Sequence, residues 1–567
     1  MRVRRLLLPG SLFALLPCSV YAEISISGAA MNAASRIPSG FPDYGIAQGA
    51  LFELQGDELG PASAQQAEFP LPRAEGLAGT TVQVTVGDRV VDVLLVSTSA
   101  KLVRAILPSE APLGEGTVAV RYRGNSARTS IHVVESAFGI FQQPGSLFGP
   151  ALAWNHESTG VEGNTILRSA RAGQRVTVVG TGLGAIATDE RNATEPGESA
   201  AEPKVLVGGQ PARVISRGRR GSVYSIPGLP DGLSAIDQVT FEVPERVSGC
   251  SVSLTVEIGE RLSNWAALSV AAEGGNCPEV STLSKDDVSR LTESGPLAAG
   301  FLSLVRVALS VPLPGLGGIS VRLDVGSASF QRLSPGSLPF SALGFPRISP
   351  GNCMVTPGQL VNLNPAPGGN VQAAIEVTNG LDAGPWIRIR GPKGERQVKA
   401  TQPGAYSDLI GQSISGLLED GFLDPGDYTI DNGDGGSQVR SFSVPVVVLP
   451  AAAWINANEV SAVVRSRDLD VTWSTPDSSA LVSIIGFSTA PGGAIASFEC
   501  LARPGDGQFR VPAAVLRSLP SSRPSGLTDV SGAIFVSIVR GERITLPGMD
   551  LAGAASVTLT GKALSFQ

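Results

Sequence analysis

Apolar and polar side chains alternate along many short stretches of the chain. Residues 82–86 read VQVTV, so Val82, Val84 and Val86 would lie on one side of an extended strand. A period of two residues is typical of a β-strand with one buried face, because successive side chains point to opposite faces. Turn residues recur about every 8–12 residues, a spacing typical of two-sheet sandwiches. The pattern predicts an all-β fold, a string of β-sandwich domains.

An internal repeat organises the first half of the chain. Residues 51–61 read LFELQGDELGP and residues 176–185 read VTVVGTGLGA, each a strand that ends in a turn of the form G-x-x-L-G. A hairpin pattern and a closing strand pattern follow in the same order in both copies, so we infer two copies of one β-domain. The spacing between matching positions grows from 124 at the turns to 136 at the closing patterns. We therefore expect a loop-like insertion in the second copy, at about Gly218–Asp237.

These motifs resemble IPT/TIG immunoglobulin-like domains. The G-x-x-L-G turns, the hairpin VGGQPARV and the opening NAAS at residues 32–35 are similar to a tandem module of secreted bacterial proteins, and the likeness extends to Val270. The link at residues 136–141 reads SAFGIF, with Ala-Phe where the family usually has a proline, which affects the expected local chain direction. The resemblance implies immunoglobulin-like sandwiches at 23–135 and 136–272. The family has no assigned catalytic residues, so it implies none here.

The second half of the chain is also predicted to be rich in strands. Residues 273–350 are typical of a linker with short strands and one short helix near 284–293, where a serine can cap the helix and two aspartates favour its N-terminal dipole. We expect a β-rich domain at 351–449 and a C-terminal β-sandwich at 450–567.

The first 22 residues are typical of a secretory signal peptide. Arg2, Arg4 and Arg5 precede an apolar stretch that is too short to span a bilayer, and Ala22 provides a small residue before the expected cleavage point. No later segment has 18 consecutive apolar residues, so we expect no transmembrane segment after cleavage. The mature chain is predicted to be secreted, in the extracellular space or at the cell surface, with the periplasm as the alternative.

Composition and charge further restrict the fold class and the kind of partner that the protein could bind. The 68 glycines and 41 prolines exclude long helices and coiled coils, and 43 % hydrophobic residues favour a folded chain. The formal net charge is −7, and it becomes −10 once the three arginines of the signal are removed. An acidic chain is a poor partner for nucleic acid, which requires clustered lysine and arginine. The basic group Arg217, Arg219 and Arg220 is flanked by glycines and is expected in a solvated loop.

Four cysteines remain after Cys18 leaves with the signal. An even number in an exported chain with no C-x-x-C spacing favours disulfides over a zinc site. Three connectivities are open, and we favour Cys250–Cys277 and Cys353–Cys500. The first pair flanks a strand-turn-strand unit within one domain, and the second would close a long loop across the C-terminal half.

Catalytic chemistry has little support in the sequence. His132 is expected to face solvent on a closing strand, and His156 is expected in a polar turn. There is no G-x-S-x-G elbow, and the stretch GTGLG at 180–184 lacks both the spacing and the lysine of a phosphate-binding loop, so it is read as a β-turn. We expect a non-enzyme without a cofactor.

Two sets of residues are the candidate ligand-binding positions. One set consists of acidic residues that could supply oxygens to calcium, with hairpin turns as the competing interpretation: Asp424, Asp427, Asp431 and Asp434. The other set consists of aromatic residues that could stack on a ligand, Trp386 and Trp454, whereas Trp473 is expected in a sandwich core.

The leading hypothesis is therefore a secreted, non-catalytic interaction or structural protein that binds an unknown protein or glycan. The alternative is a carbohydrate-binding accessory protein for extracellular polysaccharide. A hydrolase with hidden carboxylate pairs is the third hypothesis, and it would need two carboxyl groups about 5–10 Å apart on facing strands.

Overall fold

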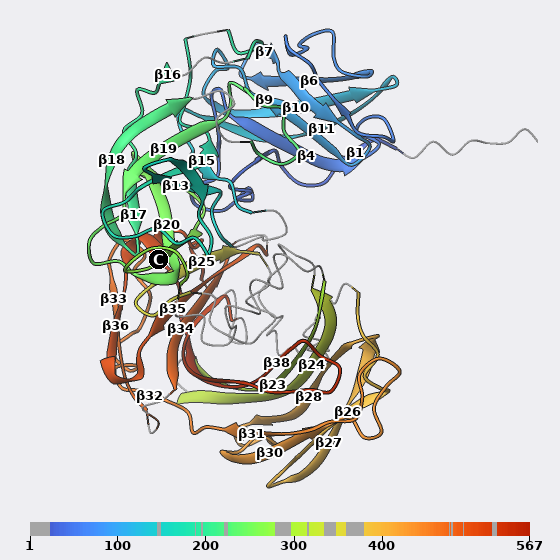
Figure 1. Ribbon diagram of the computed structural model, residues 1–567, viewed down its shortest axis with the longest axis vertical. Coiled ribbons are helices and arrows are strands. Elements are labelled where there is room, and N and C mark those ends of the chain that lie inside the picture. Colours follow the sequence, from blue (N-terminus) through green and yellow to red (C-terminus); the bar gives the residue numbers. More distant parts are fainter. Residues whose placement is uncertain are drawn as a thin grey trace, which may run out of the picture.

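The computed structural model describes residues 23–143, 149–187, 189–193, 197–219, 225–277, 296–313, 317–333, 348–358, 379–475, 477, 480–490, 493–523 and 530–567. The described residues form β-strands joined by turns and loops, with one short α-helix, α2 (Ala513–Arg517). Two N-terminal domains lie at one end of the molecule and a larger C-terminal β-body, residues 296–567, lies at the other (Figure 1). The expected signal peptide and the expected helix near 284–293 lie outside the described residues.

Domain 1 is a sandwich of two antiparallel sheets, apart from one parallel contact between β3 and β11. Alternate side chains such as Val82, Val84 and Val118 fill the space between the sheets, which confirms the predicted alternation. The first sheet contains β1 (Ser25–Ile26), β2 (Met31–Asn32), β4 (Leu51–Asp57), β5 (Gln65–Gln66), β8 (Leu94–Thr98) and β9 (Leu102–Ile106). The second contains β3 (Ile46–Ala47), β6 (Thr80–Val86), β7 (Arg89–Asp92), β10 (Gly114–Tyr122) and β11 (Asn125–Val134).

Domain 2 repeats this arrangement with its strands hydrogen-bonded into one folded sheet, in which β18 joins the two halves. Its strands are β12 (Gly139–Ile140), β13 (Ala153–Glu157), β14 (Gly160–Gly163), β15 (Arg175–Thr181), β16 (Gly197–Glu198), β17 (Lys204–Val207), β18 (Gln210–Arg219), β19 (Asp237–Glu242), β20 (Gly249–Ile258), β21 (Arg261–Leu262) and β22 (Ala266–Val270). His156 lies in β13 rather than in the predicted turn, because the hairpin turn comes two residues later.

The predicted repeat is visible in the strand pairing. Gly56 in β4 pairs with Ile26, and Gly180 in β15 pairs with Ile140 in the same geometry. A Cβ atom on Gly56 would lie 1.9 Å from the Ser25 carbonyl oxygen, and one on Gly180 would lie 2.1 Å from the Gly139 carbonyl oxygen. Both copies therefore require glycine at this position, because a neighbouring strand passes too close for any side chain.

The insertion in the second copy is loop-like, as predicted, and its described residues pack against domain 1. Its described residues carry Ile226, Leu229 and Leu233, which pack against Leu51 and Leu94 on the outer face of the first sheet of domain 1. An apolar interface of this kind fixes the two domains relative to each other.

A buried ion pair completes the contact between domains 1 and 2. Arg219 lies at the end of β18 with its side chain 4 % exposed, and its Nε donates to Asp237 at 2.8 Å. The same guanidinium donates to the carbonyl of Gly184 at 2.5 Å and reaches that of Gly49 in domain 1 at 3.5 Å. The expectation of a solvated arginine is wrong at this position, because the side chain is buried under the insertion. A buried charge requires a partner, and Asp237 supplies it.

The C-terminal body is organised by a 13-stranded sheet that crosses both predicted boundaries, at 350 and at 449. Its strands are β23 (Leu297–Leu313), β24 (Gly317–Leu333), β25 (Cys353–Pro357), β26 (Trp386–Gly391), β27 (Gly394–Gln402), β28 (Ala405–Ile414), β29 (Leu418–Asp420), β30 (Gly426–Asp431), β31 (Ser443–Val448), β34 (Leu481–Thr489), β35 (Ile495–Ala502), β37 (Gly532–Arg543) and β38 (Leu551–Ala563). A small sheet of β32 (Ala453–Trp454), β33 (Leu469–Ser474) and β36 (Gln508–Val511) covers one end, next to the 3-10 helix η1 (Pro504–Asp506).

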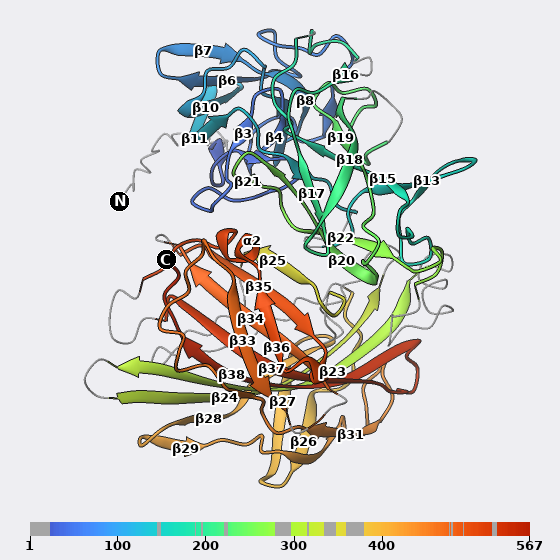
Figure 2. The same ribbon diagram turned by 90° about the vertical axis from the view of Figure 1, so that its left-hand side faces the viewer.

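The long sheet encloses two main cores and also carries a smaller apolar cluster that includes Val307 and Phe535. One lies between β34, β37 and the small sheet, and contains Ile484, Val536 and Val471. The other lies where the sheet folds back on itself, so that β31 packs on β38; there Ser556 Oγ donates to the Val447 carbonyl oxygen at 2.6 Å. β23 and β38 lie in the middle, between the two cores, and run parallel to each other (Figure 2).

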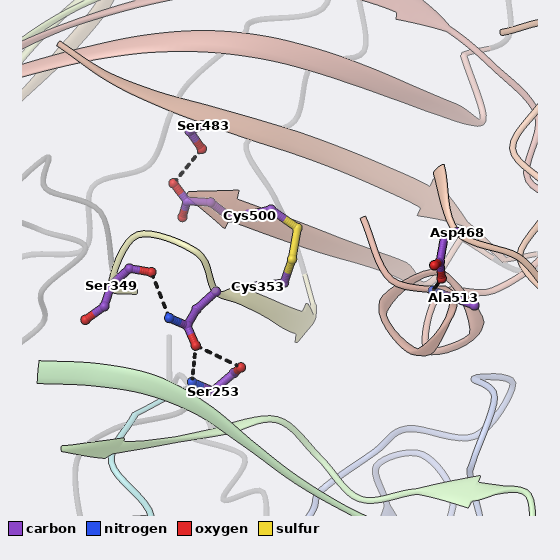
Figure 3. The surroundings of a disulfide bond; sticks show 9 residues. Ser253, Ser349, Cys353, Asp468, Ser483, Cys500 and Ala513 are labelled. Carbon is purple, nitrogen blue, oxygen red and sulfur yellow. Dashed lines mark hydrogen bonds between the residues drawn. A yellow bond between two sulfur atoms is a disulfide. The ribbon is translucent and has the colours of Figure 1, made fainter. Parts of the chain in front are cut away.

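The body is joined to domain 2 by hydrogen bonds beside a disulfide (Figure 3). Asn352 Oδ1 accepts from the backbone N–H of Ser253 at 3.2 Å, and Cys353 follows immediately in the chain. Trp265 of domain 2 donates from Nε1 to Ser518 Oγ at 3.1 Å. Phe41 of domain 1 also enters the core of the body, so all three units meet at this junction.

Candidate functional site

Both predicted disulfides are present. Cys250 and Cys277 join β20 to the chain after β22, and Cys353 and Cys500 join the neighbouring strands β25 and β35. The second disulfide fixes the strand that follows Asn352, so it supports the contact between the body and domain 2. Each bond is therefore placed to stabilise a unit, and neither presents a reactive thiol.

The four aspartates proposed for calcium are held apart by different partners. Asp424 pairs with Arg322 at 3.0 Å and Lys393 at 2.9 Å, whereas Asp431 pairs with Arg388 at 2.9 Å. Asp427 and Asp434 are exposed. Within the described ranges, no group of three or more histidine, cysteine or acidic side chains is arranged to hold a metal ion. The geometry therefore favours the hairpin interpretation of these residues.

The two candidate stacking tryptophans lie in different environments. Trp454 is 8 % exposed, belongs to the core of the body and donates from Nε1 to Asn456 Oδ1 at 2.8 Å. A buried ring cannot stack on a ligand, so the structure contradicts this candidate. Trp473 lies beside it in the same core, as predicted. Trp386 is half-buried at the start of β26 and remains the aromatic candidate.

Trp386 begins β26, which lies in the layer formed by β27, β26, β30 and β31, at the end of the molecule farthest from domain 1 (Figure 1). Along β26 the side chains alternate, because Ile387 and Ile389 enter the core. The outward residues of this layer, which we call the Trp386 face, are Trp386, Arg388, Arg390, Glu395, Gln397, Lys399 and Asp431.

The ring of Trp386 is held in place from two sides. The guanidinium carbon of Arg388 lies 5.3 Å from the ring centroid, a cation–π contact. The ring edge lies against Gly433, where a Cβ atom would be 2.6 Å from the ring. Gly433 has a φ of 60° in the predicted hairpin turn, so glycine here serves both the turn and the tryptophan.

Asp431 organises the charges of the face. It accepts from Arg388 at 2.9 and 3.1 Å and from Arg390 at 2.6 Å, and Glu395 lies 3.7 Å from Arg390. Burial alone would raise the pKa of Asp431, but hydrogen bonds from Arg388 and from the Gly433 N–H outweigh it and hold this pKa below its usual value. The carboxylate thus stays ionised and keeps both guanidinium groups in fixed positions.

This arrangement places an aromatic ring beside several hydrogen-bond donors. A held aromatic ring offers an apolar surface, and the neighbouring guanidinium, amide and ammonium groups offer hydrogen-bond donors. Gln397 lies opposite Arg388 and Lys399 lies opposite Trp386 on the adjacent strand, and both are exposed. A flat face with one ring and several donors fits a ligand rich in oxygen atoms.

The histidines lie far from this face in the chain, on the N-terminal domains. His132 Nδ1 lies 2.6 Å from Glu115 Oε1 on the neighbouring strand. His156 Nε2 lies 2.7 Å from Thr177 Oγ1. Both are thus engaged in contacts between adjacent strands. The sequence singled out Trp386, and it named Asp431 only as a calcium candidate. Their shared contact with Arg388 was not predicted, because Asp431 and Gln397 reach β26 only through strand pairing.

Comparison with known proteins finds only distant likenesses, all among solved structures. No protein-family model and no curated protein sequence matches the chain. Among solved structures, the chain is similar to immunoglobulin domains 1–4 of Sidekick-1, at 10 % identity over 94 % of this chain and 98 % of that one, with a TM-score of 0.11. It is also similar to SGBP-B from a complex xyloglucan utilization locus in Bacteroides uniformis, at 12 % identity over 87 % and 98 %, with a TM-score of 0.15.

A third likeness, to the extracellular region of plexin A4, covers 42 % of this chain and 17 % of that one, at 12 % identity and a TM-score of 0.14. The chain therefore spans about a sixth of that protein. These likenesses are distant, and the all-β class of the chain rests on its own strands and sheets. No helix in the described part of the chain is long and apolar enough to cross a membrane.

Proposed function

We propose that this protein is a secreted, non-catalytic interaction protein that binds its ligand through the Trp386 face. The observation that carries the proposal is the tryptophan ring held between Arg388 and Gly433 on an outward sheet face. The core does not require this residue, since the adjacent Ile387 and Ile389 supply the buried side chains of the strand. A polar face that holds an aromatic ring in place is more consistent with recognition than with packing.

Export is part of the proposal. Two disulfides are formed among the described residues, and such bonds persist in oxidising compartments outside the cytosol. The first 22 residues have the charge and hydrophobicity of a signal peptide. We place the tandem domains in the IPT/TIG type found in secreted bacterial proteins, because the G-x-x-L-G turns and the NAAS opening match that module.

The rigid junctions fit a presenting role. Domain 2 contacts domain 1 through its insertion and contacts the body through Ser253 and Trp265. In this proposal, domains 1 and 2 act as a stalk that presents the far end of the body, where the Trp386 face lies (Figure 2).

A glycan is the second candidate ligand, beside a protein partner. Aromatic rings flanked by hydrogen-bonding side chains suit sugars, whose C–H groups stack while their hydroxyls bond to the flanking groups. Gln397 and Lys399 are placed to act in this way beside Trp386.

The test is to screen the mature protein against immobilised extracellular polysaccharides and, in parallel, against extracellular protein fractions. We expect W386A and R388A each to lower the affinity for the captured ligand at least tenfold. R510A is the matched control, because Arg510 also pairs with an aspartate on an exposed sheet face, at 2.8 Å from Asp470. Binding that survives W386A and R388A unchanged would remove the Trp386 face as the site.

A further inference from the structure

The second sheet of domain 1 has a polar outer face. Val82, Val84 and Val118 of this sheet enter the core, so the residues that alternate with them point the opposite way. Next to the turn between β10 and β11, these outward residues form two rows across β6, β10 and β11. We call them the Arg121 face: Thr81, Arg121 and Ser126 in one row, and Gln83, Ala119 and Arg128 in the other. The sheet lies at the end of the molecule opposite the Trp386 face (Figure 1).

Two arginines are neighbours on this face. Arg121 is paired with Ser126, and Arg128 is the next residue of β11 on the same side. Diagonal neighbours of this kind have Cα atoms about 7–8 Å apart, so one ligand can contact both guanidinium groups. Both side chains are exposed.

A third arginine is held at the turn beside the face. Arg123 and Gly124 connect β10 to β11, with φ angles of 50° and 84°. Turns with two positive φ values favour asparagine and glycine, and an arginine in this conformation is uncommon. The guanidinium carbon of Arg123 lies 5.0 Å from the ring centroid of Tyr122, which keeps the charge beside the face. The turn itself does not require an arginine, and a side chain kept at positive φ is typical of functional positions.

None of these three arginines has a carboxylate partner among the described residues. In the same domain, by contrast, Arg36 and Arg104 both lie within ion-pair distance of Glu53, at 2.9 and 3.7 Å. The three guanidinium groups therefore form a local excess of positive charge in a chain whose formal net charge is −7.

The acidic side chains on the same sheet are distant and already engaged. Asp92 on β7 accepts from the Gln83 amide at 2.9 Å. Strand pairing places Asp92 three strands from Arg128, about 14 Å at the usual strand spacing. Glu115 lies at the far end of β10, with its Oε1 2.6 Å from Nδ1 of His132.

The acidic side chain before β6 is engaged as well. Glu75 pairs with Arg191 of domain 2 at 2.9 Å, so it belongs to the contact between the two domains. Exposed charges farther apart than about 8 Å are largely screened at physiological ionic strength. No described carboxylate therefore neutralises the three arginines, and an added anion would be their first charged partner.

The composition of the face indicates the kind of anion. A protein interface has an apolar core, whereas Ala119 is the one apolar member of the Arg121 face. Thr81, Gln83 and Ser126 add hydroxyl and amide groups, which hydrogen-bond to sugar hydroxyls. A nucleic acid carries dense phosphate charge, which the net negative charge of the chain repels and which requires a larger basic surface.

We propose that the Arg121 face, together with Arg123, binds an acidic polysaccharide through the carboxylate groups of its sugars. The planar fork of arginine matches the two oxygens of a carboxylate, and arginines on adjacent strands can engage successive acidic sugars of one chain. Several contacts to one chain raise the affinity above that of each contact alone. The site goes beyond the proposed function and does not rest on it, because it shares no residue with the Trp386 face.

The experiment measures binding of polygalacturonate to the mature chain by calorimetry, with dextran as the uncharged polysaccharide. We expect saturable binding of polygalacturonate, none of dextran, and at least a fivefold loss of affinity in R121Q and in R128Q. R89Q is the matched control, because Arg89 is exposed at the opposite end of the same sheet and its replacement removes the same charge. It should change the affinity by at most about twofold. Equal losses in R89Q and R121Q would mean general charge attraction only and would overturn the site.

Arg123 supplies a readout that a purely structural role would not give. R123N should melt at or above the wild-type temperature, because asparagine suits a positive φ. It should nevertheless bind polygalacturonate at least fivefold more weakly than the wild type. Wild-type affinity in R123N would overturn the assignment of Arg123 to the site.

The remaining comparisons separate this proposal from the proposed function and from other anions. W386A should bind polygalacturonate as the wild type does, although it should lose the ligand of the Trp386 face. Loss of polygalacturonate binding in W386A, with R121Q unchanged, would overturn the Arg121 face as the site. The absence of binding in the wild type would overturn the proposal outright. Tighter binding of dextran sulfate, or of vesicles that contain phosphatidylserine, would overturn the choice of a polysaccharide carboxylate.

Discussion

The two copies of the repeat have different ion pairs beside the equivalent glycine: one pair is exposed to solvent and the other is buried. In domain 1, Gly56 donates its N–H to the Lys101 carbonyl oxygen, and the Lys101 side chain pairs with Asp57 at the surface, where these side chains are 75 % and 54 % exposed. In domain 2, the equivalent Gly180 pairs with Asp237, which is fully buried and binds Arg219. One copy thus has a solvated ion pair where the other has a desolvated one.

The difference separates two roles within the repeat. The glycine is needed to form each sandwich, whereas the buried ion pair belongs to the contact between the two domains. Glycine is required in both copies, because a neighbouring strand passes within 2.1 Å of the missing Cβ atom. The buried charge pair occurs only where the insertion covers it and where domain 1 supplies the Gly49 carbonyl oxygen. The sandwich is therefore stable without this ion pair, which serves the interface between the domains.

The largest effect is expected from R219M. The substitution leaves Asp237 buried without its cation and should lower the free energy of unfolding by about 4 kcal/mol. The matched change in the other copy, K101M, should cost at most about 1 kcal/mol, because exposed ion pairs contribute little. Urea denaturation followed by tryptophan fluorescence measures both. Equal losses of unfolding free energy in R219M and K101M would show that burial does not make one ion pair more important for stability than the other.

A second variant, R219M/D237N, sharpens this comparison. The amide oxygen of asparagine can still accept from the N–H groups of Gly182 and Leu183, which now bond to Asp237 at 2.7 and 2.8 Å. Removal of the unpaired charge should therefore recover part of the stability lost in R219M.

Truncation of the insertion core should have the next largest effect. Leu233 is 1 % exposed and packs between the domains, so L233A should cost about 3 kcal/mol. Leu113 in domain 1 is 46 % exposed, and L113A should stay within about 0.5 kcal/mol of the wild type. Differential scanning calorimetry reports both, and we expect L233A to split the melting of domains 1 and 2. A single unchanged transition would contradict the role of the insertion as a clamp.

The smallest expected effect is the pH dependence of the unfolding free energy that arises at the junction of the three units. Burial raises the pKa of Asp43 to about 6, against the opposing hydrogen bond from the Leu262 N–H and the charges of Arg261 and Arg517. A carboxyl group with a raised folded-state pKa stabilises the protein when protonated, and this stability is lost as the pH rises through 6. Unfolding should therefore cost about 1 kcal/mol more at pH 5 than at pH 7 from this group.

D43N isolates this contribution, because asparagine keeps an acceptor for Leu262 but does not titrate. The difference in unfolding free energy between pH 5 and pH 7 should shrink by about 1 kcal/mol in D43N. Burial also raises the pKa of Glu190 and Asp237, so these groups act in the same direction as Asp43. A pH profile that is identical in D43N and the wild type would exclude Asp43 as its source.

Local patterns carried the predictions that succeeded. Period-two alternation identified the strands, and the spaced G-x-x-L-G turns identified the repeat, because both depend on residues close in sequence. The pairing of the four cysteines was predicted from their positions within the expected domains, and both disulfides are present.

The errors arose where distant segments meet. Arg219 was expected in solvent because glycines flank it, and only the packed insertion and domain 1 bury it. Trp454 was a stacking candidate because of its residue type, but its side chain is buried in the core of the body. Asp431 was named only as a calcium candidate, and its pairing with Arg388 was missed because it forms between strands 43 residues apart.

The parallel contact between β23 and β38 has a consequence for biosynthesis. β38 separates β23 from β37 in the middle of the long sheet, and its first paired residue, Leu551, lies opposite Ala299. About 250 residues must be synthesised before β23 can gain this neighbour, and closing so long a loop is slow. Until then β23 has an open edge of 17 residues, a ready template for pairing with another chain. The body can be completed only after nearly the whole chain has left the ribosome, so a partner that masks this edge until then would benefit its folding.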